Sequence, residues 1–132
     1  MDPDFIYDLF APFGQVTIRR MFSGAGIFRD GLMIGLIVRD VIYLKADEST
    51  APDFEREDCK PFTYIRGKNS NRPTEHALPF WRLPERLYDD PDELADWARK
   101  AFAVAQRKKM AAGKRTKQRT PTKRRKAKRR KM

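Results

Sequence analysis

Hydrophobic positions at the start of the chain repeat with the spacing of a helix. The apolar face of this predicted helix consists of Phe5, Ile6, Leu9 and Phe10. Asp2-Pro3 has the order of an N-cap residue followed by proline at the first helical position, where proline is favoured. The chain therefore begins with a predicted amphipathic helix.

The pattern then changes to the alternation of apolar and polar residues that is typical of β-strands. Strands are predicted over residues 15–21, 22–28, 32–38, 41–45 and 61–65. Asp30-Gly31 is a typical hairpin turn, and Arg39-Asp40 is a second short turn. The four strands before residue 46 therefore form a predicted antiparallel meander.

The segments after this meander have weaker patterns. Residues 46–60 are polar and predict a loop or a short helix, whereas glycine, asparagine, serine and proline over residues 66–77 predict a mobile surface loop. Residues 78–83 predict an extended segment that Pro79 places at a sheet edge or at the start of a strand. Residues 84–88 predict one helical turn.

A final helix has the clearest start signal in the chain. Asp90 is the predicted N-cap, with Pro91 at the first helical position and Glu93 at the third. The helix is predicted to end near Ala111, with Gly113 as its stop. All these elements together predict an α+β fold, with a mainly antiparallel sheet and one helix at each end of the domain.

Charge divides the chain into two parts. Residues 1–106 hold 14 basic and 18 acidic residues, whereas residues 107–132 hold 15 basic residues and no acidic one. No branched aliphatic residue follows Val104, so this tail cannot bury enough apolar surface to fold by itself. We expect a folded domain over 1–106, and over 107–132 the end of the last helix followed by a disordered basic tail.

A tail of this charge density predicts binding to nucleic acid, with duplex DNA as the expected partner. Lys and Arg that meet phosphates release counterions and carry no base information, so this binding would be independent of sequence. The expected binding residues are Arg107, Lys108, Lys109, Lys114, Arg115, Lys117, Arg119, Lys123, Arg124, Arg125, Lys126, Lys128, Arg129, Arg130 and Lys131. A solubilising tail, an RNA or ribosome partner and an anionic lipid surface are the alternatives.

Other classes of protein lack support in the sequence. The longest apolar run, residues 32–38, is too short to span a membrane, and no secretory signal is expected at the acidic start. The chain has one cysteine and one histidine, which favours a reducing cytoplasm and leaves too few ligands for a zinc or iron–sulfur site. We therefore expect a cytoplasmic protein without a metal or another cofactor.

Two motifs contain residue types that occur in cofactor-binding or catalytic sites. Gly24-Ala25-Gly26 has the first two glycines of a dinucleotide-binding loop, but no third glycine and no helix follow it. Cys59 and His76 could meet in space, although no third group that would orient them is evident. We expect no catalytic residue, and a small enzyme is the least favoured alternative.

Aromatic and apolar positions suggest contact with another protein. Phe62, Tyr64, Phe80 and Trp81 either line a groove or pack in the core. Arg19, Arg20 and Arg82 either bind phosphate or an acidic partner, or pair with acids of the domain.

The strand over residues 32–38 is apolar on both faces. Simple alternation places Leu32, Ile34, Leu36 and Val38 on one face and Met33 and Ile37 on the other. The helices are expected to cover one face of the sheet. Another protein or a second copy could cover the other, so a monomer or a weak homodimer is expected.

Several runs in one order resemble the N-terminal domain of the TfoX/Sxy family. These are RMFSGAGIF (20–28), GLMIGL (31–36), YLKAD (43–47), PFTY (61–64) and FWRLP (80–84). The resemblance covers roughly residues 2–105, and Ser23 stands where the family usually has glycine. It implies a regulator of natural competence that acts with the transcription machinery, without catalytic residues. The helical C-terminal domain of some members is not expected here, where the basic tail follows instead.

Overall fold

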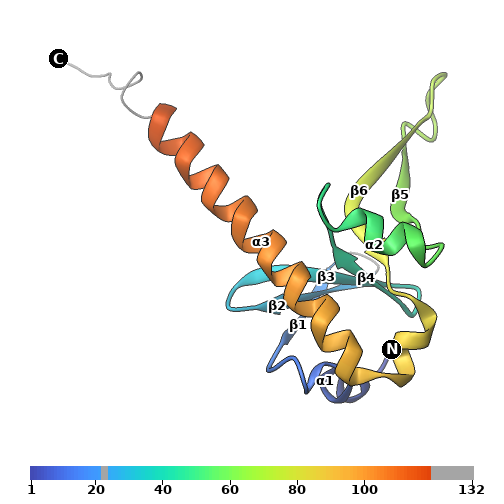
Figure 1. The fold of residues 1–132 in the computed structure, drawn as a ribbon. Coiled ribbons are helices and arrows are strands. Elements are labelled where there is room, and N and C mark those ends of the chain that lie inside the picture. Colours follow the sequence, from blue (N-terminus) through green and yellow to red (C-terminus); the bar gives the residue numbers. More distant parts are fainter. Residues whose placement is uncertain (22–23, 120–132) are drawn as a thin grey trace.

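The computed structural model describes residues 1–21 and 24–119 of the 132-residue chain. Its helices are α1 (Pro3–Phe10), α2 (Ala51–Arg56), the 3-10 helix η1 (Glu85–Asp89) and α3 (Pro91–Arg119). Its strands are β1 (Thr17–Met21), β2 (Gly24–Arg29), β3 (Leu32–Val38), β4 (Val41–Lys45), β5 (Pro61–Arg66) and β6 (Thr74–Arg82). They form one antiparallel sheet in the order β1-β2-β3-β4-β6-β5, with α1 before it and α3 after it (Figure 1). The predicted α+β class is confirmed.

The first four strands form the predicted meander, and their turns have the predicted chemistry. Asp30 and Gly31 have φ values of 51° and 79°, and Arg39 and Asp40 have φ values of 51° and 61°. Two successive residues in the left-handed region match the twist of a tight hairpin, which favours Asp-Gly at such a turn.

The position of β6 differs from the sequence prediction. This strand lies between β4 and β5 and begins at Thr74, so both expected placements of Pro79, at a sheet edge or at the start of a strand, are wrong. Pro79 is tolerated there because it lies where the β5–β6 register shifts, so no ladder hydrogen bond needs its missing N–H group. Its carbonyl accepts a hydrogen bond from the N–H of Ala46 at 3.0 Å.

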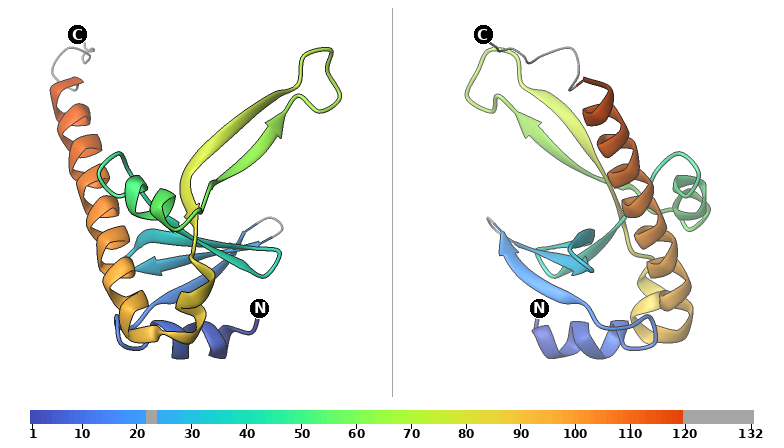
Figure 2. Two further views of the ribbon diagram at one scale, coloured as in Figure 1. Left: turned by 45° about the vertical axis from the view of Figure 1, so that its right-hand side comes forward. Right: turned by 90° about the vertical axis from the view of Figure 1, so that its left-hand side faces the viewer.

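Helices α1 and α3 cover one side of the sheet, the inner face (Figure 2). Asp2 caps α1 as predicted, because its carboxylate accepts the N–H of Asp4 at 3.2 Å. Phe5 is 42% exposed, although the helical pattern placed it with the buried residues. Each residue turns a helix by about 100°, so a side chain next to the centre of the apolar stripe can still point to solvent. The buried core consists mainly of Ile6, Leu9, Phe10, Ile27, Ile34, Ile42, Leu44, Leu83, Leu87, Leu94, Ala98 and Ala101.

A bulge in β3 overturns the predicted alternation of its side chains. Ile27 of β2 pairs with Gly35, whereas Phe28 pairs with Met33, so Ile34 is an extra residue in the ladder. Ile34 and Ile37 are therefore both in the core, while Leu36 lies on the opposite side of the sheet.

The segment predicted to be a surface loop is partly a strand. Thr74, Glu75, His76 and Ala77 pair with β5, so residues 63–77 form a hairpin that we name the β5–β6 arm. Their polar composition hides this strand, because a two-stranded ribbon with both faces exposed needs no apolar alternation.

Helix α3 starts as predicted and continues further than predicted. The N–H of Glu93 donates to the Asp90 carboxylate at 3.1 Å, which confirms the N-cap. The expected end near Ala111 is wrong, because the helix runs through Gly113 to Arg119. One glycine costs a helix only about 1 kcal/mol, and neighbouring alanine and lysine residues favour helix. The predicted disordered tail falls mostly on residues 120–132, which lie outside the described residues.

Candidate interaction surfaces

The basic end of α3 projects from the body of the domain. Val104 and Ala105 are buried, whereas residues 106–112 are all exposed. The predicted binding residues Arg107, Lys108 and Lys109 lie on this exposed part of the helix. Four more lie on the helical backbone that follows, Lys114, Arg115, Lys117 and Arg119. The remaining predicted residues lie beyond the described part of the chain, Lys123, Arg124, Arg125, Lys126, Lys128, Arg129, Arg130 and Lys131.

Arg107 has a structural partner that the sequence did not reveal. Its guanidinium donates to the Asp47 carboxylate at 2.9 Å, which ties α3 to the loop after β4. Hydrogen bonds from the side chains of Ser49 and Arg107 lower the pKa of Asp47. Lys108 and Lys109 form no ion pair among the side chains of residues 1–21 and 24–112, so within this range the unpaired cations of α3 begin at Lys108.

The second surface is the side of the sheet that faces away from α1 and α3, the outer face. One row across it follows from the strand register, because Arg19 pairs with Gly26, Gly26 with Leu36, Leu36 with Tyr43 and Tyr43 with Arg82. Directly paired residues project from the same side of a sheet. The same register places further residues on the outer face, among them Thr17, Met21, Phe28, Met33, Val38, Val41, Lys45, Phe62 and Phe80.

Cations and aromatic rings are interleaved on the outer face. The Arg19 guanidinium lies 5.2 Å from the centre of the Phe28 ring, and the Lys45 ammonium lies 5.6 Å from that of Phe80. Burial, and to a lesser degree the charge of Lys108, lowers the pKa of Lys45. None of the residues that define the outer face is acidic. The outer face is therefore apolar with a positive rim.

The four aromatic residues that were candidates for a binding groove, Phe62, Tyr64, Phe80 and Trp81, do not form one site. Phe62 packs edge-on against Tyr43 on the outer face, with ring centres 5.2 Å apart. Trp81 contacts Phe54 of α2 beside the inner face instead. Tyr64 lies on the arm, stacked on His76.

Arg19, Arg20 and Arg82, the three arginines expected to bind phosphate or to pair with acids, do not all lie on one surface. Arg19 and Arg82 are on the outer face, whereas Arg20 lines an open pocket of about 420 Å³ beside α1, together with Ile18 and Arg39. Within residues 1–21 and 24–119, none of Arg19, Arg20 and Arg82 is paired with an acid. The alternative that they pair with acids of the domain is therefore wrong for the described residues.

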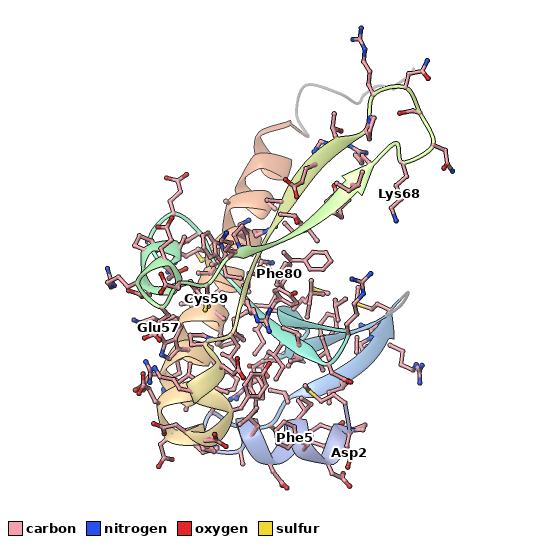
Figure 3. The ribbon with its side chains drawn as sticks, turned by 90° about the vertical axis from the view of Figure 1, so that its right-hand side faces the viewer. Asp2, Phe5, Glu57, Cys59, Lys68 and Phe80 are labelled. Carbon is pink, nitrogen blue, oxygen red and sulfur yellow. The ribbon has the colours of Figure 1, made fainter. Side chains whose placement is uncertain are left out.

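Cys59 and His76, the candidate catalytic pair, each hydrogen-bond a different residue. The Cys59 thiol donates to the Glu57 carbonyl at 3.7 Å, and burial, with the nearby Glu57 charge, raises the pKa of this thiol. His76 instead hydrogen-bonds Thr74 on the arm at 2.8 Å. Figure 3 shows Cys59 near α2 and Lys68 at the far end of the arm.

The two glycines of the Gly-x-Gly motif lie inside strand β2 rather than in a loop. A Cβ atom at Gly24 would collide with the Ile37 carbonyl, and one at Gly26 would meet the Met21 sulfur at 2.8 Å. Close packing within the sheet therefore accounts for both glycines.

Two further findings apply to the described part of the chain. Its helices are all too short or too polar to cross a membrane. No group of three or more His, Cys, Asp or Glu side chains in it is arranged to hold a metal ion.

The fold defines a small α+β domain, with helices on one side of an antiparallel sheet and an apolar face that carries arginine and lysine on the other. A family model for the TfoX N-terminal domain matches residues 8–105. The chain therefore belongs to the TfoX N-terminal domain family, as its sequence resemblance indicated. The search of curated proteins found no match to the chain.

Proposed function

We propose that this protein is a non-catalytic regulatory adaptor of the cytoplasm, which binds duplex DNA through its basic C-terminal segment and a protein through its outer face. The observation that carries the proposal is the course of α3, whose first half packs into the core and whose second half leaves it. From Arg107 onward the sequence contains no acidic residue. A stiff helix that begins in the core thus presents cations at a distance from an acidic domain.

Electrostatics supports duplex nucleic acid as the partner of this segment. The domain over 1–106 has an excess of acidic residues, so its net charge opposes binding to a polyphosphate, and residues 107–132 hold most of the charge that attracts one. No aromatic residue follows Phe102, so the segment offers no stacking platform for single-stranded bases. Contact with phosphates of a duplex is the remaining mode of recognition.

The outer face supports a protein partner for the domain. The centre of the outer face is apolar, with Met33, Leu36 and Tyr43 only partly buried. The cations of this face are not neutralised by acidic residues of the face. A partner with apolar side chains among acidic ones fits this surface. The family resemblance favours a component of the transcription machinery.

The proposed binding of DNA by the basic C-terminal segment can be tested by measuring duplex binding of the full chain and of a variant that ends at Gln106. The shortened chain keeps Val104 and Ala105, which are buried in the core. If about eight phosphates are contacted, the slope of log affinity against log salt is roughly −7 for the full chain. The shortened chain should bind too weakly to measure. Equal affinities of the two chains would reject the proposal.

Capture of transcription proteins by the full chain tests the outer face. The Tyr43→Asp substitution places a negative charge in the centre of this face, and Tyr7→Asp is the matched control on the exposed side of α1. Transcription proteins should be retained by the parent and by the control, and lost with Tyr43→Asp. The same set of proteins on all three baits would contradict a role for the outer face.

A further inference from the structure

The β5–β6 arm is the part of the fold that the proposed function leaves without a role. Strand β6 pairs with β4 only at residues 80–82, and beyond them it pairs only with β5. Every residue from 63 to 75 is exposed. The arm leaves the sheet on the side opposite α1 (Figures 2 and 3). A two-stranded ribbon without a core contributes little to stability, so the packing of this domain does not explain the arm.

Local hydrogen bonds shape the tip of the arm. The N–H and the hydroxyl of Ser70 both donate to the Gly67 carbonyl, at 2.9 and 2.8 Å. The Arg72 N–H donates to the Ser70 hydroxyl at 3.2 Å. Gly67 has a φ of 68°, a conformation that favours glycine. The tip is therefore a defined turn that is held away from the body.

The arm is basic, and its charges are not neutralised internally. Residues 63–77 hold three basic residues and one acidic residue, Glu75. Arg66, Lys68 and Arg72 at the tip form no ion pair within residues 1–21 and 24–119. On the body, by contrast, Arg86 is held between two glutamates. Three exposed cations without partners are suited to an anionic ligand.

The shape and chemistry of the arm fit a groove of DNA. The major groove of B-DNA is about 12 Å wide and admits a two-stranded β-ribbon. Asn69, Ser70 and Asn71 carry donors and acceptors at the tip, between the cations. Amide and hydroxyl groups can hydrogen-bond base edges, and arginine and lysine can hold the flanking phosphates.

We infer that the β5–β6 arm inserts into the major groove of duplex DNA, while the basic end of α3 contacts the phosphate backbone. The arm and α3 both extend away from α1, so one duplex can meet both elements (Figure 2). This inference rests on the proposed association with DNA. It assigns a groove contact to the arm and adds three phosphate-binding cations of the arm to those of α3.

The test measures binding of a mixed-sequence duplex of about two helical turns at several salt concentrations. The arm variant of the full chain carries Arg66→Gln, Lys68→Gln and Arg72→Gln. Its charge-matched control carries Arg39→Gln, Arg56→Gln and Arg99→Gln, three exposed positions away from the arm. Because the substituted side chains of the arm are exposed, the melting temperature of the arm variant should equal that of the parent.

The arm variant should bind about tenfold more weakly than the parent at low salt, with a salt slope reduced by about three. The control should stay within about threefold of the parent, because its charges act only at a distance. If the arm variant matches the control while the chain that ends at Gln106 no longer binds, the arm inference fails and the proposed function stands. If neither the arm variant nor the shortened chain differs from the parent, both fail.

A second duplex separates groove insertion from contact with phosphates alone. In it, glucosylated hydroxymethylcytosines fill the major groove and leave the backbone unchanged. The parent should bind this duplex about as weakly as the arm variant binds ordinary DNA, and the arm variant should bind both duplexes equally. Equal binding of the parent to both duplexes would overturn insertion into the major groove.

Discussion

The Tyr88→Phe substitution isolates one hydrogen bond that joins η1 to the sheet. The Tyr88 hydroxyl accepts the backbone N–H of Ile42, in β4, at 2.9 Å. The chain after β6 still pairs with Ile42 on one side, because the Leu83 N–H donates to the Ile42 carbonyl at 2.8 Å, but the Ile42 N–H finds its acceptor in the Tyr88 side chain. Ile42 is completely buried, and its N–H has no other partner among the described residues when the hydroxyl is removed.

A buried donor left without a partner costs about 1–3 kcal/mol. Urea unfolding of Tyr88→Phe should show this loss in the free energy of unfolding, and the Tm should fall by at least about 4 °C. Tyr7→Phe is the control, because Tyr7 is 42% exposed, and it should change the free energy by less than about 0.5 kcal/mol. A loss of less than about 0.5 kcal/mol in Tyr88→Phe would refute the reasoning.

The pH dependence gives a second readout of the same residue. Burial raises the pKa of Tyr88, partly opposed by the hydrogen bond from Ile42. A group with a raised pKa in the folded state contributes stability that is complete below its unfolded pKa, about 10 for tyrosine, and is lost as the pH rises above it. The stability difference between the parent and Tyr88→Phe should therefore shrink above pH 10.

Three further predictions concern the sheet, the surface charges and the tail. Ile34→Ala should lower the free energy of unfolding in urea by about 2–5 kcal/mol, and Leu36→Ala should lower it clearly less, because the bulge places Ile34 but not Leu36 in the core. Equal losses in the two variants would contradict this register. Hydrogen bonds from Arg86 lower the pKa values of Glu57 and Glu93, so Arg86→Gln should lower the Tm at pH 7. The difference should shrink as the pH falls through these lowered pKa values and both carboxylates take up protons, and a difference that does not change with pH would contradict the pairing. Raising the salt from about 50 to 200 mM should weaken duplex binding by the full chain by roughly 10⁴-fold, and binding that is insensitive to salt would contradict phosphate contact.

Local sequence signals predicted the parts of the fold that depend on neighbouring residues. Asp2 and Asp90 cap their helices, and Asp30-Gly31 closes a hairpin, because each needs only a short-range hydrogen bond or one backbone conformation. The division of charge at residue 106 was equally visible, and it led to the candidate DNA-binding segment.

Features that depend on distant pairing were not predictable in this way. The bulge at Ile34 reverses the order of the faces in β3, and only the partner strand reveals it. The insertion of β6 between β4 and β5 rests on non-local hydrogen bonds. The first strand of the arm was predicted, but the pairing of residues 74–77 with it was missed, because these exposed residues have the polar composition of a loop. Basic residues without acidic neighbours at the tip were the signal that the sequence contained.

The outer face was foreseen only in outline. Apolar residues on both sides of β3 indicated that a second surface needed cover, but its cations come from strands far apart in the sequence. Arg19, Lys45 and Arg82 are brought to one side of the sheet by the register alone. Sequence spacing contains no information of that kind.

Amide chemical shifts of the full chain, followed while duplex DNA is added, test the central claim most directly. We predict that the shifts concentrate on α3 from Lys108 onward and on residues 66–72 of the arm, with none on the acidic helix α1. Shifts spread over α1 and the acidic body, or no shift beyond Arg107, would contradict an adaptor whose DNA contacts are confined to its projecting basic elements.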